Sequence, residues 1–206
     1  MKYIPFENFT ISGKRRSHRM LGAPVSEWCW HVVKRRVEIV EYDPKWAVLY
    51  IEEKARILSA IGHLSVAVEH IGSTAVARLG AKPIIDILVG VNCLSDARLC
   101  IEPLGSLGYV YQPEHEVTMP ERRFFGKGEP PREQHYHLHM VEKGGEFWRR
   151  HLAFRDYLRS HPETSRQYCE LKKKLASECG SDREGYTEAK TQFIESVVAR
   201  ALRNRT

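Results

Sequence analysis

The spacing of hydrophobic positions changes several times along the chain, and each change marks a predicted element. From Trp46 to Ile61, just before Gly62, apolar side chains recur at near-helical spacing, which predicts a helix with one buried face. Asp43 and Pro44 precede this segment and have the chemistry of a helix start. The segments 66–71 and 84–91 are short and rich in β-branched residues, so we expect strands there.

The remaining pattern predicts more strands and then a helical tail. Further strands are expected at 37–40, 109–111, 122–125 and 135–141. Further helices are expected at 95–107, at 145–161, from Pro162 to about 178, and from Ser181 or Asp182 towards Leu202. Strands and helices that alternate and end in consecutive helices are typical of an α/β or α+β protein. We therefore expect a mixed β-sheet packed with helices, followed by a C-terminal helical segment.

Length and composition indicate a globular protein. The 206 residues suffice for one ordinary domain, and 42% hydrophobic residues exclude intrinsic disorder of the whole chain. The longest nearly uncharged apolar run, 83–94, contains Asp86 and is far shorter than the roughly 20 residues that cross a bilayer. No secretory signal is evident, so a cytoplasmic protein without a membrane segment is expected. The five scattered cysteines contain no CxxC pair and indicate neither disulfides nor a zinc site.

The formal net charge of +6 is concentrated at the start of the chain. Residues 1–36 hold eight of the 32 basic side chains and two of the 26 acidic ones, so the rest of the chain is neutral. We expect this segment to be a poorly ordered basic extension; the alternative is a basic arm that contacts anions or a partner. Residues 37–203 form the expected domain, and its neutral charge does not indicate nucleic acid as a partner.

A single carboxylate lies in the most apolar of the expected strands. Because alternate strand residues share a face, the odd-numbered positions of 85–91 form an apolar row, and Asp86 belongs to the opposite row. A buried Asp86 needs a metal ion, a basic side chain or backbone N–H groups beside it; the alternative is a strand-end aspartate that caps a loop. Gly72 and Ser73, after the preceding strand, could cradle a phosphate or form a plain helix N-cap.

Three histidines alternate along the expected strand 135–141. His135, His137 and His139 would share one face, and the residues between them would pack inward. Three imidazoles in a row favour a functional site over an incidental exposed face. They could contact phosphate or bind a transition metal, since imidazole favours Zn²⁺, Mn²⁺ or Fe over Mg²⁺.

Basic side chains near these positions are candidate anion contacts. Lys82 precedes the apolar strand and could reach a phosphate from its loop, or it could simply be solvated. Arg122 and Arg123 lie on opposite faces of one expected strand, so only one of them can point at the site, and we select Arg123. Arg155 is adjacent to Asp156, which favours a structural ion pair.

Several separated blocks resemble the GrpB family, in family order along the chain. The two most informative blocks are His70-Ile71-Gly72-Ser73-Thr74-Ala75-Val76 and Ala81-Lys82-Pro83-Ile84-Ile85-Asp86-Ile87. Other similar blocks are 41–46, 122–125, 137–139, 151–158 and 186–190. Together the blocks cover roughly residues 37–202, and the basic extension lies outside them.

The resemblance implies a polymerase-β-like nucleotidyltransferase fold. In that superfamily a Gly-Ser pair binds nucleotide phosphate, and acidic residues on neighbouring strands hold Mg²⁺. Gly72, Ser73 and Asp86 match those positions. The superfamily pattern places a second acidic residue two positions after the first, where this chain has Leu88, which cannot ligate a metal ion. A two-metal site of the usual kind is therefore not expected.

The leading hypothesis is a protein that binds a nucleoside triphosphate or related phosphate ligand with a divalent metal ion, Mg²⁺ or Mn²⁺, with Zn²⁺ as an alternative. It would transfer a nucleotidyl group to an unknown acceptor. The expected phosphate contacts are Gly72, Ser73, Lys82 and Arg123, and the expected catalytic and metal-binding residues are Asp86, His137 and His139. The first alternative is a non-catalytic module that binds a nucleotide, a coenzyme or a partner protein. The second is a histidine-triad enzyme with His137 as its nucleophile, because the strand satisfies that family's alternating pattern.

Overall fold

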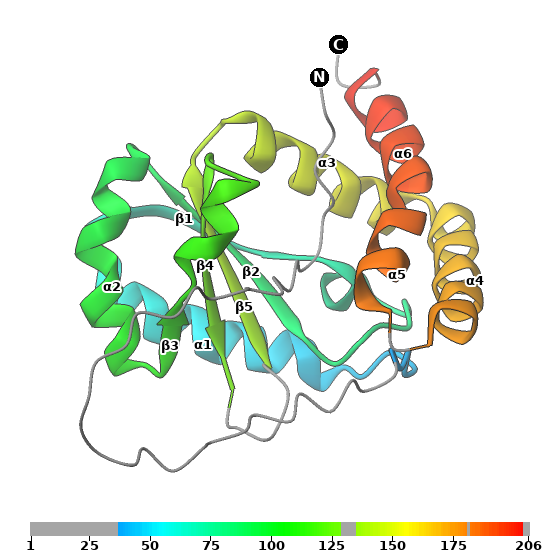
Figure 1. Ribbon diagram of the computed structural model, residues 1–206, viewed down its shortest axis with the longest axis horizontal. Coiled ribbons are helices and arrows are strands. Elements are labelled where there is room, and N and C mark those ends of the chain that lie inside the picture. Colours follow the sequence, from blue (N-terminus) through cyan, green and yellow to red (C-terminus); the bar gives the residue numbers. More distant parts are fainter. Residues whose placement is uncertain (1–36, 129–134, 181, 204–206) are drawn as a thin grey trace, which may run out of the picture.

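A five-stranded mixed sheet lies at the centre of the computed structural model, which describes residues 37–128, 135–180 and 182–203 (Figure 1). The strands are β1 (Ser65–Ile71), β2 (Ile85–Val91), β3 (Tyr109–Tyr111), β4 (Arg122–Lys127) and β5 (Tyr136–Glu142). Their order across the sheet is β1-β2-β5-β4-β3. β2 and β5 run parallel, and the other neighbouring pairs are antiparallel.

Helices cover both faces of this sheet. The described α-helices are α1 (Lys45–Ile61), α2 (Ala97–Ser106), α3 (Glu146–Ser160), α4 (Pro162–Cys179), α5 (Arg183–Ala189) and α6 (Thr191–Arg203). α1 and α2 pack on one face, whereas α3 contacts β1 and β5 on the other. Figure 1 shows α4, α5 and α6 gathered beside the sheet. The protein therefore has the α+β fold that the hydrophobic pattern predicts, with a C-terminal helical segment.

β2 is buried on both faces. Its odd-numbered residues belong to the core that faces α1 and α2, as the alternation predicts. The opposite row is covered as well, because Leu88 packs against Trp148 of α3. A Cβ on Gly90 in the same row would lie 2.8 Å from the Trp148 ring. α3 therefore closes much of the face on which Asp86 lies and confines polar groups to one end of the strand.

Two expected elements differ from the structure. The strand expected at 37–40 is reduced to a single bridge, in which Val40 and Ala81 exchange two backbone hydrogen bonds of 2.9 Å. The last expected helix is divided into α5 and α6, because the Lys190 N–H bonds to the Thr187 carbonyl, and this tighter turn ends α5. The basic extension 1–36 lies outside the described residues.

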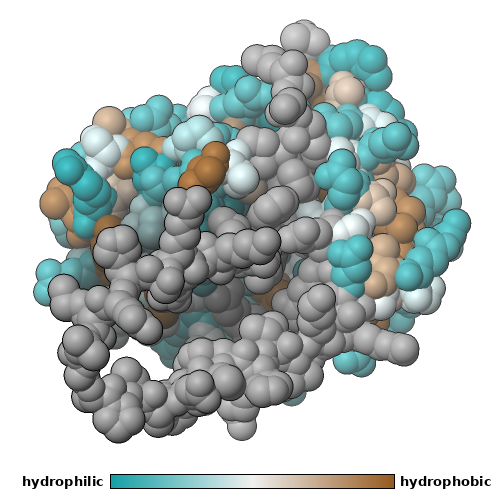
Figure 2. Space-filling model, in the orientation of Figure 1, coloured by the Kyte–Doolittle hydropathy of each residue, from teal (hydrophilic) through white to brown (hydrophobic). Residues whose placement is uncertain are grey.

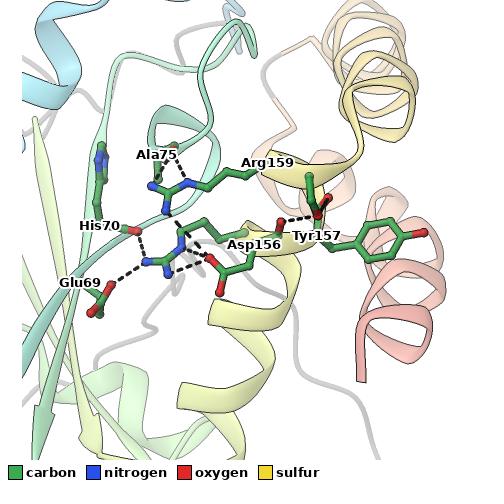
Figure 3. Close-up of polar contacts among 8 residues, drawn as sticks. Glu69, His70, Ala75, Asp156, Tyr157 and Arg159 are labelled. Carbon is green, nitrogen blue, oxygen red and sulfur yellow. Dashed lines mark hydrogen bonds and ion pairs between the residues drawn. The ribbon is translucent and has the colours of Figure 1, made fainter. Parts of the chain in front are cut away.

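Two arginines of α3 fasten β1 and the turn that follows it (Figure 3). Arg155 donates to Glu69 at 2.7 Å and forms the expected ion pair with Asp156 at 2.8 Å. Arg159 donates from both Nε and Nη2 to the Ala75 carbonyl oxygen, at 3.0 and 2.8 Å. These contacts fix the start of the C-terminal helical segment against the turn that carries the Gly-Ser pair.

The outer surface mixes residue types. Figure 2 shows hydrophilic and apolar residues interspersed over the helices of the visible face. Among the helices of the described ranges, none is both long and apolar enough to cross a membrane.

Candidate functional site

Asp86 and two histidines of β5 converge on one side of the sheet. In the parallel register Asp86 is opposite His137, and the next pair on the same face is Leu88 with His139. His137 Nδ1 lies 3.2 Å from Asp86 Oδ1, and His139 Nε2 lies 3.8 Å from the same oxygen. All three polar side chains are buried. The structure thus brings the three expected catalytic positions together, whereas His135 precedes β5 and is exposed.

The electrostatics of this cluster favour an ionised carboxylate beside a neutral imidazole. Burial alone would raise the pKa of Asp86, but the His137 hydrogen bond and the nearby His139 outweigh it and hold that pKa well below its usual range. Burial lowers the pKa of His139 to about 4, although the Asp86 carboxylate 3.8 Å away opposes the shift. At neutral pH, Asp86 is therefore negative and His139 is uncharged.

Arg122 of β4 extends this buried cluster. Its Nη1 lies 3.0 Å from His139 Nδ1. Because an arginine only donates hydrogen bonds, Nδ1 is the acceptor, and the proton of neutral His139 is on Nε2, which faces Asp86. The Arg122 side chain is fully buried, with its guanidinium 5.0 Å from the Phe124 ring centroid and 5.9 Å from that of Phe147. Burial lowers the pKa of Arg122 to about 10, so it stays a cation at neutral pH.

Arg123 does not reach the cluster, so the choice of Arg123 as the anion contact is corrected. The register pairs Arg123 with Met140, on the face of the sheet opposite Asp86. Its guanidinium lies 3.2 Å from Glu116. Because strand residues alternate, the side chains of Arg122 and Arg123 point to opposite faces of the sheet. Which of them faces the site depends on how β4 pairs with β5, and this pairing is a long-range contact.

Lys172 of α4 is a candidate site residue that no sequence motif indicated. Its side chain is buried, and Nζ donates to Ser73 Oγ at 2.9 Å and to the Gly80 carbonyl oxygen at 2.5 Å. The lysine belongs to a run of three, which by itself suggests a solvated helix face. Helical spacing supplies the missing signal, because Lys172 shares a stripe with the buried residues Tyr168 and Leu175.

A small cavity opens beside Asp86, with a volume of about 20 Å³, enough for one water-sized group. Its lining includes Ser73, Lys82, Asp86, His137, Lys172 and Tyr186. The Lys82 ammonium group lies 5.7 Å from the centroid of the Tyr186 ring. His139 lines a second space of about 20 Å³, which also borders Asp86. Serine, two lysines, the carboxylate and one imidazole therefore share a single cavity.

Gly72 allows the turn to approach the Asp86 carboxylate closely. Its φ is +68°, and a Cβ at this position would lie 2.2 Å from Asp86 Oδ2. We expect Gly72→Ala to destabilise the folded protein by about 2 to 3 kcal/mol, from left-handed strain together with the displaced carboxylate. Urea denaturation followed by circular dichroism measures the loss.

Gly108→Ala is the matched control for this substitution. Gly108 also has a positive φ, +88°, but the nearest atom to an added Cβ is 3.8 Å away. The control therefore reports backbone strain alone, about 1 kcal/mol. Equal losses for Gly72→Ala and Gly108→Ala would contradict the close contact with the carboxylate.

The buried donors are arranged as a hydrogen-bonded cluster. Within the described ranges, no group of three His, Cys, Asp or Glu side chains is placed to hold a metal ion. His139 directs an N–H rather than a lone pair at Asp86, and both imidazoles approach the same Asp86 oxygen. The arrangement fits a carboxylate–imidazole hydrogen-bond network better than a metal site built from Asp86, His137 and His139.

The sheet order, the Gly-Ser turn and the buried aspartate define an α+β protein with a polar site between its sheet and its C-terminal helices. Residues 36–200 match the family model described as GrpB protein, and the chain belongs to the GrpB family. The resemblance seen in the sequence blocks is thereby confirmed.

Related proteins agree with this assignment. The chain is 39% identical to the UPF0157 protein YqkA of Bacillus subtilis, over 82% of this chain and 48% of that protein. It is 36% identical to the glutamate-rich protein GrpB of Alkalihalophilus pseudofirmus, over 81% of this chain and 97% of that protein. The crystal structure of the conserved protein GrpB from Enterococcus faecalis has a TM-score of 0.73 and 35% identity, covering 82% of this chain and 99% of that chain. The chain thus spans about half the length of the Bacillus subtilis relative, and the three names state no activity.

Proposed function

We propose that this protein binds a phosphate-bearing small molecule of the nucleoside triphosphate class at the cavity beside Asp86. The observation that carries the proposal is the buried Lys172, whose ammonium group donates to Ser73 on the Gly-Ser turn. Lys82 lines the same cavity. Two lysines and a hydroxyl at a glycine turn can donate hydrogen bonds to phosphate oxygens. The cavity admits one water-sized group, so it would hold a phosphoryl oxygen while the rest of the ligand lies outside.

Asp86 gives this cavity a negative side that suits a divalent ion carried by the ligand. Mg²⁺ is commonly held by one or two carboxylates together with substrate phosphates rather than by a complete protein cage. Asp86 would supply the protein carboxylate, and the His137 hydrogen bond at 3.2 Å would orient it. Mn²⁺ and Zn²⁺ are the other ions to be tested in this position.

A non-catalytic binding module is the second candidate, and Leu88 favours it. Clamping the attacking and leaving oxygens of a nucleotidyl transfer between two metal ions needs a second carboxylate facing the first. Leu88 stands at that position and is fully buried against Trp148. A protein of this kind would retain its ligand unmodified.

Calorimetric titration with ATP, GTP, CTP and UTP, each with Mg²⁺ or Mn²⁺, tests the proposed ligand class. We expect Lys172→Met and Asp86→Asn to weaken binding at least about tenfold, because each removes a charged contact of the cavity. Lys174→Met is the matched control, since Lys174 belongs to the same run and its side chain is 70% exposed. Equal affinity of wild type and Lys172→Met, or no binding of any nucleotide, would overturn the proposal.

Incubation of the protein with α-phosphate-labelled nucleotide and a cell extract separates the enzyme from the binding module. Label that moves to an acceptor identifies a transferase, whereas label recovered in unmodified ligand identifies the module. Acid-labile label on the protein that disappears in His137→Ala would instead identify a histidine-triad mechanism.

A further inference from the structure

A large groove lies across the Gly-Ser turn from the Asp86 cavity, and the proposed function does not use it. Its volume is about 980 Å³, compared with about 20 Å³ beside Asp86. Thr74 lines both spaces, so this turn is their common wall. The groove runs between the start of α1, the segment 74–78 and the junction of α3 with α4. Ligand pockets generally enclose about 300 to 1,000 Å³, so a nucleotide-sized molecule fits.

One part of the groove wall is aromatic and apolar. Its residues include Tyr42, Tyr50, Val76 and Leu158. The Tyr50 hydroxyl donates to the Val68 carbonyl oxygen at 2.9 Å, and its ring stacks on His70 with 4.5 Å between centroids. Arg159 holds the opposing segment through its two bonds to the Ala75 carbonyl (Figure 3). A surface fixed in this way can accept a flat ring with little further loss of side-chain entropy.

The charged residues of the groove carry a net positive charge. The basic members are Arg78, Arg159, Arg166 and Lys173, and the acidic members are Glu41 and Glu170. Lys173 is paired with Glu41 at 2.7 Å, and Arg166 is paired with Glu163 of its own helix. Within the described part of the chain, the hydrogen bonds and ion pairs include none for the Arg78 side chain. Among the described residues, Arg78 is therefore a groove cation whose donors reach no acceptor.

Arg78 also has a strained backbone. Among the described residues it is the one non-glycine residue with a positive φ, +65°. Glycine adopts this conformation without the steric cost that a Cβ brings. The residue is exposed, so packing does not account for an arginine at this position. Strain of this kind is concentrated at ligand-binding sites, where the side chain has a function that outweighs the cost.

We propose that this groove binds an organic anion of nucleotide size, with a flat ring on the wall formed by Tyr42 and Tyr50 and a negatively charged group on Arg78. The site is separate from the Asp86 cavity and does not depend on the function proposed there. It contains cations of its own, so binding needs no divalent metal ion.

Calorimetric titration with adenosine 5′-monophosphate in the absence of metal tests this proposal, with adenosine as a ring-only probe and inorganic phosphate as a charge-only probe. We expect the monophosphate to bind at least about tenfold more tightly than either fragment, because it uses both walls. Arg78→Gly is expected to weaken its binding about tenfold while raising the Tm of the ligand-free protein by about 1 to 3 °C, because the strain is relieved.

Charge placement supplies a matched pair of variants. Ala47 lines the groove and is exposed on α1, so Ala47→Glu is expected to repel the monophosphate and weaken binding several-fold. Val48 is the next residue, 54% exposed and outside the groove lining, so Val48→Glu is expected to leave binding unchanged. Ser73→Ala and Asp86→Asn serve as comparison variants, because they alter the cavity beside Asp86 and leave the groove unchanged.

The groove is supported as the binding site if Arg78→Gly and Ala47→Glu weaken binding of the monophosphate and Val48→Glu does not. This conclusion holds whether or not the variants of the Asp86 cavity also weaken binding. No binding of the monophosphate, or weakening confined to Ser73→Ala and Asp86→Asn, overturns the groove. Loss of triphosphate binding in Lys172→Met bears only on the Asp86 cavity, so the two proposals can fail separately.

Discussion

Leu88→Asp is expected to unfold the protein rather than to restore a two-metal site. Leu88 is fully buried and packs against Ile71, Val141 and Trp148. An aspartate there would bury a second carboxylate beside the ionised Asp86, and the neighbouring His139 is neutral and already bonded to Arg122. We expect a loss of at least about 4 kcal/mol in the free energy of unfolding. Urea denaturation measures it where the variant still folds, and circular dichroism shows where it does not.

Leu88→Met is the matched control for this substitution, because it keeps an apolar side chain of similar volume and is expected to cost less than about 1.5 kcal/mol. The pair of variants separates packing from charge. A folded Leu88→Asp protein that has gained Mn²⁺ binding would show that α3 can move to accommodate a second carboxylate. The site would then be a dormant catalytic centre rather than a degenerate one.

Acidification from pH 6.5 to pH 4 is expected to destabilise the protein by several kcal/mol. Burial lowers the pKa of His70 and of His139 from 6.5 to about 4. Above pH 6.5 both histidines are neutral in the folded and the unfolded state. Between pH 6.5 and 4 these histidines become protonated in the unfolded chain but stay neutral in the folded chain. The free energy of unfolding therefore falls as the pH falls. One pKa unit corresponds to about 1.4 kcal/mol, so each histidine contributes on the order of 3 kcal/mol.

Urea midpoints recorded across this pH range measure the effect. His139→Gln is expected to reduce the pH dependence between pH 6.5 and 4 but not to abolish it, because burial also lowers the pKa of His70, His115 and His151. His63→Gln removes an exposed histidine and is expected to leave the dependence unchanged. Asp86 acts in a different window, because its pKa is depressed and its contribution is lost only below the usual range of a carboxylate. An unchanged pH dependence in His139→Gln would contradict the buried neutral imidazole.

Much of the fold could be predicted from local pattern. The apolar row of β2, the helix that follows Pro44 and the interruption before α4 are consequences of side-chain period and of proline chemistry. Division of the last helix could not be predicted in this way, because it depends on one tightened turn at Lys190. The strand expected at 37–40 has the right residues, but only Val40 finds a pairing partner.

The candidate site likewise combines residues that local motifs predict with residues that only tertiary contacts bring in. Asp86, His137 and Ser73 were predicted from a lone carboxylate, an alternating histidine row and a Gly-Ser turn, and each motif lies within a few residues along the chain. Arg122 and Lys172 were missed because one depends on how β4 pairs with β5 and the other on where α4 docks. The groove beside Arg78 is likewise formed by three separate segments of the chain, 41–51, 70–78 and 158–173.

The amino-acid sequence alone determined the family, the class of fold and the identity of the buried acid, because these follow from short-range periodicity and from contiguous motifs. Only the tertiary structure decided which arginine meets His139, that Leu88 is covered by Trp148, and that Lys172 reaches Ser73. The physical reason is that side-chain period specifies which residues share a face, whereas strand pairing and helix docking specify what that face meets.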